Sequence, residues 1–240
     1  MYTVLSNLNE VEERKVILTE DFQPNAEAII AKADEKSKLL FICSPNNPTG
    51  NTIKAHKIKF LLENFKGLVV IDEAYIDFSE EASWITELEK YPNLVVTQTL
   101  SKAYGLAGIR LGLCFASEEI ISVLKKIKPP YNVNELTQQK ALERVLDVKA
   151  IQSEIDSVLA QRKVLEKALG QIDFVSEIYD SEANFVLAKV DNATERYNQL
   201  LSKGIVIRNR TTQPLCENTL RFTVGTPNEN QALIKAMNEI

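Results

Sequence analysis

The sequence is poor in cysteine and histidine, and it contains no glycine before residue 50. Its 240 residues include 3 cysteines, 1 histidine and 8 glycines. Cys43, Cys114 and Cys216 lie far apart without a CxxC pair, so neither a disulfide scaffold nor a cysteine-based metal site is predicted. Each lies beside apolar residues, so we expect buried free thiols in a reducing compartment, which favours the cytoplasm. The histidine, His56, stands in a lysine-rich polar stretch and is expected at the surface.

An excess of positive charge and long apolar runs are also missing. The net charge is -5, and the densest basic run, Lys125-Lys126 with Lys128, is typical of a solvated helix face. Nucleic acid is therefore not an expected partner. No apolar run approaches the length of a membrane span, and no signal-peptide pattern opens the chain, so a membrane association is not expected either. A hydrophobic fraction of 45% is ordinary for a globular protein.

Short apolar runs alternate with amphipathic stretches in the first half of the chain. Unalternating runs of this kind, separated by helices, are typical of a mostly parallel sheet covered on both faces. Residues 1–130 are therefore expected to form a large α/β domain. The predicted strands are 16–18, 38–43, 68–71, 94–97 and 109–116, and the predicted helices are 25–36 and 54–64.

The second half has a different pattern after Pro129-Pro130. A long stretch rich in helix-forming residues, 134–169, ends at Gly170. It is followed by a predicted strand, helix, two strands and a closing helix. The expected strands are 184–190, 205–208 and 220–224, and the expected helix before the last two is 194–202. Residues 131–240 are thus expected to be a linking helix and a small α+β domain.

Three polar motifs follow the ends of the predicted parallel strands. Asn47, Asp72 and Lys102 come after the runs that end near residues 43, 71 and 97. Because ligands bind at the carboxyl ends of strands in open α/β sheets, all three should open onto one edge. A lysine among small residues, an aspartate one strand earlier and the following Arg110 together suggest a covalently held aldehyde cofactor.

Asp72 ends a buried strand, where an unpaired carboxylate is costly. It either caps a helix, pairs with a structural arginine, or binds the protonated nitrogen of a pyridine ring. Tyr75 and Asn47 have ordinary alternatives as a packing residue and as part of an Asn-Pro-Thr-Gly turn. In the functional interpretation, both side chains hydrogen-bond the phenolic oxygen of the cofactor.

Lys102 is the predicted catalytic residue, and its alternative is a helix-start lysine in a turn of small residues. A protonated lysine is a poor nucleophile, so burial and the nearby cation of Arg110 would favour the neutral amine. Small residues from Ala103 to Gly108 leave room for a ring. Thr99, Ser101 and Arg110 offer hydroxyls and a guanidinium suited to a phosphate.

These motifs resemble those of fold-type-I pyridoxal-phosphate aminotransferases. They are Ser-Pro-Asn-Asn-Pro-Thr-Gly (44–50), Asp-Glu-Ala-Tyr (72–75) and Thr-Leu-Ser-Lys-Ala-Tyr-Gly-Leu-Ala-Gly-Ile-Arg (99–110). Within that group the chain is most similar to the histidinol-phosphate aminotransferases, with further support from segments 128–134 and 220–226. The resemblance runs over essentially the whole chain.

The resemblance implies a role for each candidate. Lys102 would carry the Schiff base of pyridoxal 5'-phosphate and move a proton during transfer. Asn47, Asp72 and Tyr75 would bind the cofactor ring, and Thr99, Ser101 and Arg110 its phosphate. The expected reaction exchanges an amino group between L-histidinol phosphate and 2-oxoglutarate in histidine biosynthesis, in a homodimer.

Arg221 matches the substrate-anion arginine of the family. Leu220, Phe222 and Val224 should share one strand face, so Arg221 lies on the other, which could border a cleft or solvent. Arg208 is a second candidate for the substrate anion.

This sequence also differs from the family it resembles. Family members carry more than a hundred residues before the position matched by Met1. That part supplies the first strands, a Gly-rich phosphate turn, a ring-stacking aromatic residue and a tyrosine donated across the dimer. We therefore expect a sheet without its N-terminal strands and weakened cofactor binding. Another fold-type-I enzyme, such as an aromatic aminotransferase or a threonine-phosphate decarboxylase, and a non-catalytic fragment remain alternatives.

Overall fold

The first half of the chain forms a four-stranded sheet in a computed structural model that describes residues 2–240. Its strands are β1 (Leu39–Cys43), β2 (Leu68–Asp72), β3 (Leu94–Thr99) and β4 (Gly112–Ala116). The strands lie side by side in this order. β1, β2 and β3 are parallel, whereas β4 runs antiparallel to β3. The predicted mostly parallel α/β sheet is confirmed.

One face of this sheet is covered by two helices, α2 (Ala26–Lys32) and α3 (Ala55–Asn64). Ile42, Ile71 and Val96 are register partners on β1, β2 and β3, and all three lie in the same buried cluster as Ile58 and Leu61 of α3. Alternation along each strand directs the other side chains to the opposite face. Burying this apolar surface holds the three strand ends in fixed relative positions.

The opposite face is only partly covered, which corrects the expectation of a sheet covered on both sides. Leu39 and Phe41 of β1 remain 55% and 42% exposed. The short helix α1 (Tyr2–Leu8) contacts this face through Tyr2, whose ring lies 4.6 Å from that of Phe41. A helix of seven residues covers too little area to bury the whole strand.

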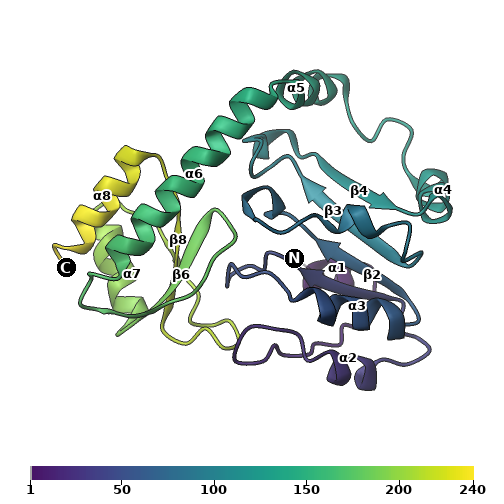
Figure 1. Ribbon diagram of the computed structural model, residues 1–240, viewed down its shortest axis with the longest axis horizontal. Coiled ribbons are helices and arrows are strands. Elements are labelled where there is room, and N and C mark those ends of the chain that lie inside the picture. Colours follow the sequence, from purple (N-terminus) through teal and green to yellow (C-terminus); the bar gives the residue numbers. More distant parts are fainter. Residues whose placement is uncertain (1) are drawn as a thin grey trace.

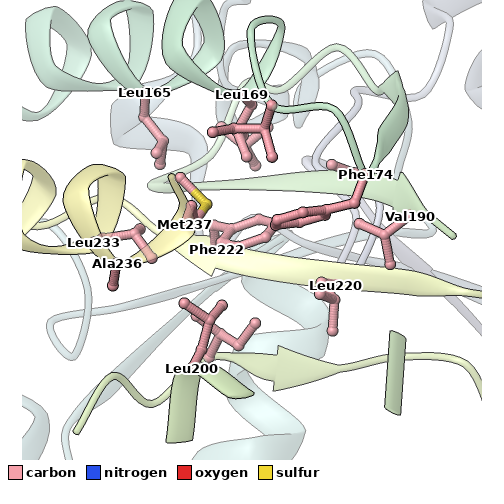
Figure 2. Close-up of a cluster of buried hydrophobic side chains, with 14 of the residues drawn as sticks. Leu165, Leu169, Phe174, Val190, Leu200, Leu220, Phe222, Leu233, Ala236 and Met237 are labelled. Atoms are coloured by element: carbon pink, nitrogen blue, oxygen red, sulfur yellow. The ribbon is translucent and has the colours of Figure 1, made fainter. Parts of the chain in front are cut away.

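The second half forms an antiparallel sheet with the strand order β5-β6-β8-β7. Its strands are β5 (Val175–Ile178), β6 (Phe185–Val190), β7 (Arg208–Asn209) and β8 (Thr219–Thr223), and its helices are α7 (Ala193–Ser202) and α8 (Pro227–Met237). Figure 2 shows its core, where Leu165 and Leu169 of the preceding helix converge with Phe222 and Met237.

A long helix, α6 (Val148–Leu169), connects the two sheets (Figure 1). Ile151 and Ile155 near its start pack in a buried cluster with Tyr75 from the first half and Phe185 from the second. The same helix therefore contributes to the packing of both halves. The domain boundary at residue 130 stays a prediction. Within residues 2–240 no helix combines the length and apolar character needed to cross a bilayer.

Several predicted elements differ from the structure. Residues 16–18 are extended but form no strand, because no neighbouring strand pairs with them in residues 2–240. The helix predicted over 25–36 ends at Lys32, since Asp34 accepts hydrogen bonds from the amides of Lys36 and Ser37 and forms a local turn. β5 and the helix α4 (Glu118–Ile127) were not predicted.

The predicted long helix 134–169 is two helices, α5 (Glu135–Leu146) and α6. Asp147 separates them, and its side chain accepts a hydrogen bond from the amide of Ala150 at 3.2 Å as the N-cap of α6. The strand predicted over 109–116 begins only at Gly112, because Arg110 adopts a left-handed conformation with φ 56°. The strand predicted over 205–208 is reduced to the two residues of β7.

Candidate active site

The carboxyl ends of β1, β2 and β3 meet at one edge of the first sheet. Cys43, Asp72 and Thr97 are register partners across the three strands. Backbone hydrogen bonds continue past the strand ends, from Ser44 N to Asp72 O at 3.0 Å and from Glu73 N to Thr97 O at 2.8 Å. The segments that carry Asn47, Asp72 and Lys102 therefore leave the sheet side by side, as the sequence predicts.

The turn after β2 is held by Glu73, whose side chain is only 1% exposed. Its carboxylate accepts hydrogen bonds from the Ser83 hydroxyl at 2.6 Å, the Trp84 amide at 2.7 Å and the Gln98 side-chain amide at 2.9 Å. Three donors compensate for the desolvation of the buried carboxylate. This network fixes the backbone between Asp72 and Tyr75, and sequence reasoning had assigned no role to Glu73.

Tyr75 is buried and packs edge-on against Phe185 of β6, with ring centroids 5.2 Å apart. The ammonium group of Lys102 lies over the Tyr75 ring, 5.2 Å from the ring centre. The structure thus brings the predicted catalytic lysine and the predicted tyrosine together. Lys102 itself is exposed, which corrects the expectation that it is buried. It stands in an open turn closed by the hydrogen bond from Gly105 N to Lys102 O at 3.0 Å.

The predicted phosphate-binding residues lie at the end of β3 and in the loop that follows it. Thr99 Oγ1 accepts a hydrogen bond from the amide of Ser101 at 3.1 Å, which shapes the start of the loop. Arg110 is exposed, and its Nη1 donates to the carbonyl of Ala107 at 2.9 Å rather than to another predicted site residue. It lines a cavity of about 310 Å³ together with Asn132 and Asn134 from the segment before α5.

Arg221 lies on β8 and reaches across to the first sheet. Its Nη1 donates to Asn47 Oδ1 at 2.6 Å, and its guanidinium carbon lies 4.7 Å from the centre of the Phe185 ring. The Nε atom is buried and has no partner. The face of β8 that carries Arg221 therefore meets the loop after β1 and not open solvent, which the strand pattern had left undecided.

Two further arginines share this face of the second sheet. Arg208 pairs in register with Arg221, and Arg210 follows two residues later, with its amide bonded to Thr219 O at 2.9 Å. Burial lowers the pKa of Arg221, and the positive charges of Arg210 and then Arg208 lower it further. Within residues 2–240 none of the three guanidinium groups forms an ion pair.

Arg210 was not predicted as a site residue, although its position two residues after Arg208 could have indicated it. Residues two apart on a strand point to the same face, so Arg208 and Arg210 form a pair. The Nε atom of Arg210 is buried without a partner, like that of Arg221. Guanidinium groups that gather on one face and form no ion pair within residues 2–240 are suited to an anionic ligand with several oxygen atoms.

Tyr2 is a further residue near the site whose role was not predicted from the sequence. Its hydroxyl donates to Asp72 Oδ2 and lies 3.7 Å from the sulfur of Cys43. Burial, followed by the neighbouring Cys43 and Asp72, raises the pKa of Tyr2, so the phenol stays protonated. The contact joins residues 70 positions apart, and no local pattern around Tyr2 predicts it.

Comparison with known proteins places these features in a family. The family model of class I and II aminotransferases matches residues 1–237. The chain is 65% identical over 237 residues to the histidinol-phosphate aminotransferase of Flavobacterium johnsoniae, a match that covers 99% of this chain and 68% of that protein.

Solved structures agree with this relationship. The histidinol-phosphate aminotransferase of Clostridium acetobutylicum superposes with a TM-score of 0.91 at 26% identity, covering 100% of this chain and 75% of that chain. The enzyme of the same name from Sinorhizobium meliloti, in complex with pyridoxal-5'-phosphate, has a TM-score of 0.87 at 21% identity, covering 99% of this chain and 66% of that chain. The latter identity supports a shared fold only. The chain therefore belongs to the class I and II aminotransferases.

Proposed function

We propose that the chain transfers an amino group between L-histidinol phosphate and 2-oxoglutarate with pyridoxal 5'-phosphate as cofactor, as the names of its relatives suggest. The observation that carries the proposal is a continuous series of contacts, from Lys102 to Tyr75, Tyr75 to Phe185, Phe185 to Arg221 and Arg221 to Asn47. It places an amine, a phenol, an amide and a substrate-binding cation within reach of the same small molecule.

The residues present fit the cofactor by the chemistry of their donor set. Pyridoxal phosphate supplies an aldehyde that takes up the amino group and a ring that withdraws electrons. We assign Asp72 as the acceptor for the ring nitrogen, because its carboxylate stands at the strand end with lone pairs to spare. Lys102 Nζ supplies the amine and afterwards carries a proton to and from the substrate α-carbon.

Asn47 and Tyr75 are assigned to the phenolic oxygen of the cofactor. Arg221 donates to Asn47 Oδ1 at 2.6 Å, so the amide group of Asn47 is oriented with its Nδ2 hydrogens free. An amide in this orientation presents its Nδ2 hydrogens as donors to a further ligand. Arg221 thus prepares Asn47 to bind an oxygen anion while keeping its own Nε available.

Thr99, Ser101 and Arg110 are assigned to the cofactor phosphate. Thr99 ends β3, Ser101 and Arg110 lie in the following loop that also carries Lys102, and Ser101 N is bonded to Thr99 Oγ1 at 3.1 Å. For Arg110 to bind the phosphate, its guanidinium has to exchange the carbonyl of Ala107 for phosphate oxygens. Such an exchange replaces a neutral acceptor by a charged one and is favourable.

Arg221, with Arg208 and Arg210, is assigned to the anionic group of the substrate. A phosphate dianion in one half-reaction and a carboxylate in the other are both able to occupy a site lined by guanidinium groups. The absence of ion pairs for these arginines within the described residues supports the assignment.

Titration of the purified chain with pyridoxal phosphate tests the proposal. We expect visible absorbance from the bound cofactor in the wild type and in Lys125→Ala, a matched change of an exposed lysine, but not in Lys102→Ala. Histidinol phosphate with 2-oxoglutarate should turn over faster than phenylalanine with 2-oxoglutarate, and threonine phosphate should not be decarboxylated. A colourless wild type would overturn the proposal, and a preference for phenylalanine would overturn its substrate.

We also propose that the protein forms a homodimer and is located in the cytoplasm. Exposed apolar side chains on the sheet and the helices support a second copy as partner: Leu39, Phe41, Leu113, Val123, Ile127, Leu136, Leu142 and Leu146. The cysteines are free, which supports a reducing compartment. The expectation that all three are buried was wrong, because Cys216 is buried but Cys43 is only partly buried and Cys114 is exposed. Analytical ultracentrifugation should give a dimer at micromolar concentration, and a monomer would contradict the assembly.

A further inference from the structure

Both carboxylate oxygens of Asp72 are engaged by donors of the chain itself. Oδ1 accepts a hydrogen bond from the amide of Ala74 at 3.1 Å, and Oδ2 accepts one from the hydroxyl of Tyr2. A carboxylate has about four acceptor sites, so each oxygen keeps capacity for another donor. The two bonds restrict rotation of the carboxylate about its terminal torsion, which is otherwise soft.

Tyr2 is held at this position by two neighbouring residues of β1. Its ring packs on Phe41 with a centroid distance of 4.6 Å and an angle of 31° between the planes, and its hydroxyl lies 3.7 Å from Cys43 Sγ. Phe41 and Cys43 are two apart on the strand, and Cys43 is the register partner of Asp72. The three side chains therefore share one face of the sheet, on the side away from α3.

The rest of α1 contributes little to this attachment. The helix has no buried residue, and Val4 and Leu8 are 60% and 74% exposed. The phenol is accordingly the main link between α1 and the sheet. Burial raises the pKa of the Tyr2 phenol, which favours the protonated form that donates to Asp72.

We propose that Tyr2 is a positioning residue for the cofactor, which holds the Asp72 carboxylate in the orientation that accepts the hydrogen of the pyridine nitrogen. The inference rests on the proposed function, since it concerns the residue assigned to that nitrogen. Tyr2 acts through Asp72 and needs no contact with the cofactor. An Asp72 carboxylate without this donor has more orientations available and loses more entropy when it binds the ring.

The test is Tyr2→Phe, which removes the hydroxyl and keeps the ring that packs on Phe41. We expect the dissociation constant of pyridoxal phosphate to rise about fivefold, because the Asp72 carboxylate then has to be ordered when the ring binds. The pH midpoint of the visible absorbance should also move upward. With Asp72 held less firmly, the bound ring would withdraw electrons less strongly, and this midpoint would report the change.

The matched control is Tyr131→Phe, which removes a hydroxyl from a side chain that is 94% exposed, and it should change neither quantity. Tyr2→Gln offers a donor again and should restore part of the affinity. An unchanged dissociation constant and midpoint in Tyr2→Phe would overturn the inference while leaving the proposed function intact. Tighter binding would overturn it as well, because the hydroxyl would then compete with the cofactor. A wild type that binds no pyridoxal phosphate would overturn both.

Discussion

Arg221 Nη1 donates to Asn47 Oδ1 at 2.6 Å across 174 positions of the sequence. The bond joins a strand of the second sheet to the loop after the first strand of the other sheet. It connects the residue assigned to the substrate anion with a residue assigned to the cofactor. A substitution of Arg221 should therefore weaken the binding of both the substrate and the cofactor.

Replacing Arg221 by glutamine tests this connection. The variant loses the charge that attracts the substrate anion and frees the Asn47 amide to rotate. We expect KM for histidinol phosphate to rise about 100-fold, the range for removing a charge-assisted contact in a cleft. The dissociation constant of pyridoxal phosphate should rise by a smaller factor. Steady-state kinetics and absorbance titration measure the two effects, and a KM within threefold of wild type would contradict the assignment.

Arg210→Gln should weaken substrate binding more than Arg208→Gln. The positive charge of Arg210 affects the pKa of Arg221 more than that of Arg208 does, and Arg210 Nε is buried without a partner. We expect about a tenfold rise in KM for Arg210→Gln, with kcat nearly unchanged, because the contact is present in both ground and transition states. Equal increases in KM for the two substitutions would contradict the prediction that Arg210 contributes more to substrate binding than Arg208.

Glu73→Ala should lower the stability of the fold. The substitution leaves the Trp84 amide and the Gln98 side chain without their buried acceptor. We expect a loss of about 3 kcal/mol in the free energy of unfolding, since each unsatisfied buried donor costs about 1–3 kcal/mol. Denaturant unfolding measures it. Glu81→Ala, a change of an exposed neighbour, is the control and should have little effect.

Cys43 should report on the charge of Asp72 through its alkylation rate. Burial, and then the negative charge of Asp72, raises the pKa of the Cys43 thiol from 9.0 to about 11. Only the thiolate reacts, so the rate for Cys43 should keep rising up to about pH 11. Because the folded pKa lies above the unfolded one, the protonated thiol stabilises the fold below pH 9, and this contribution is lost as the pH rises through 11.

Asp72→Asn should shift this rate profile to lower pH without bringing the midpoint down to 9.0, because burial is the larger cause. Mass spectrometry of peptides after timed alkylation gives the rates of Cys43 and of the exposed Cys114 in the same sample. A Cys43 rate that levels off at pH 9 in the wild type would contradict the prediction.

The edge of the first sheet could be predicted from the sequence because it depends on local features. The apolar runs before Asn47, Asp72 and Lys102 mark strands. Their lack of alternation also predicted burial on both faces, but the face of the sheet that carries Phe41 is only partly covered. Parallel strands bring their carboxyl ends to one edge whatever the details of packing. The order of motifs along the chain was therefore enough to place the three residues together.

Tertiary structure alone decided which side chains meet across that edge. A period of two along β8 leaves both faces open to Arg221. Leu220 and Phe222 are buried in the core of the second sheet, which leaves Arg221 on the opposite face of the strand, where it meets Asn47. The contact of Tyr2 with Asp72 likewise joins segments that share no local pattern. Local sequence determines where strands and turns begin and end, because those depend on neighbouring residues. Which side chains touch depends on how distant segments bury their apolar faces against one another, and the sequence does not carry that information locally.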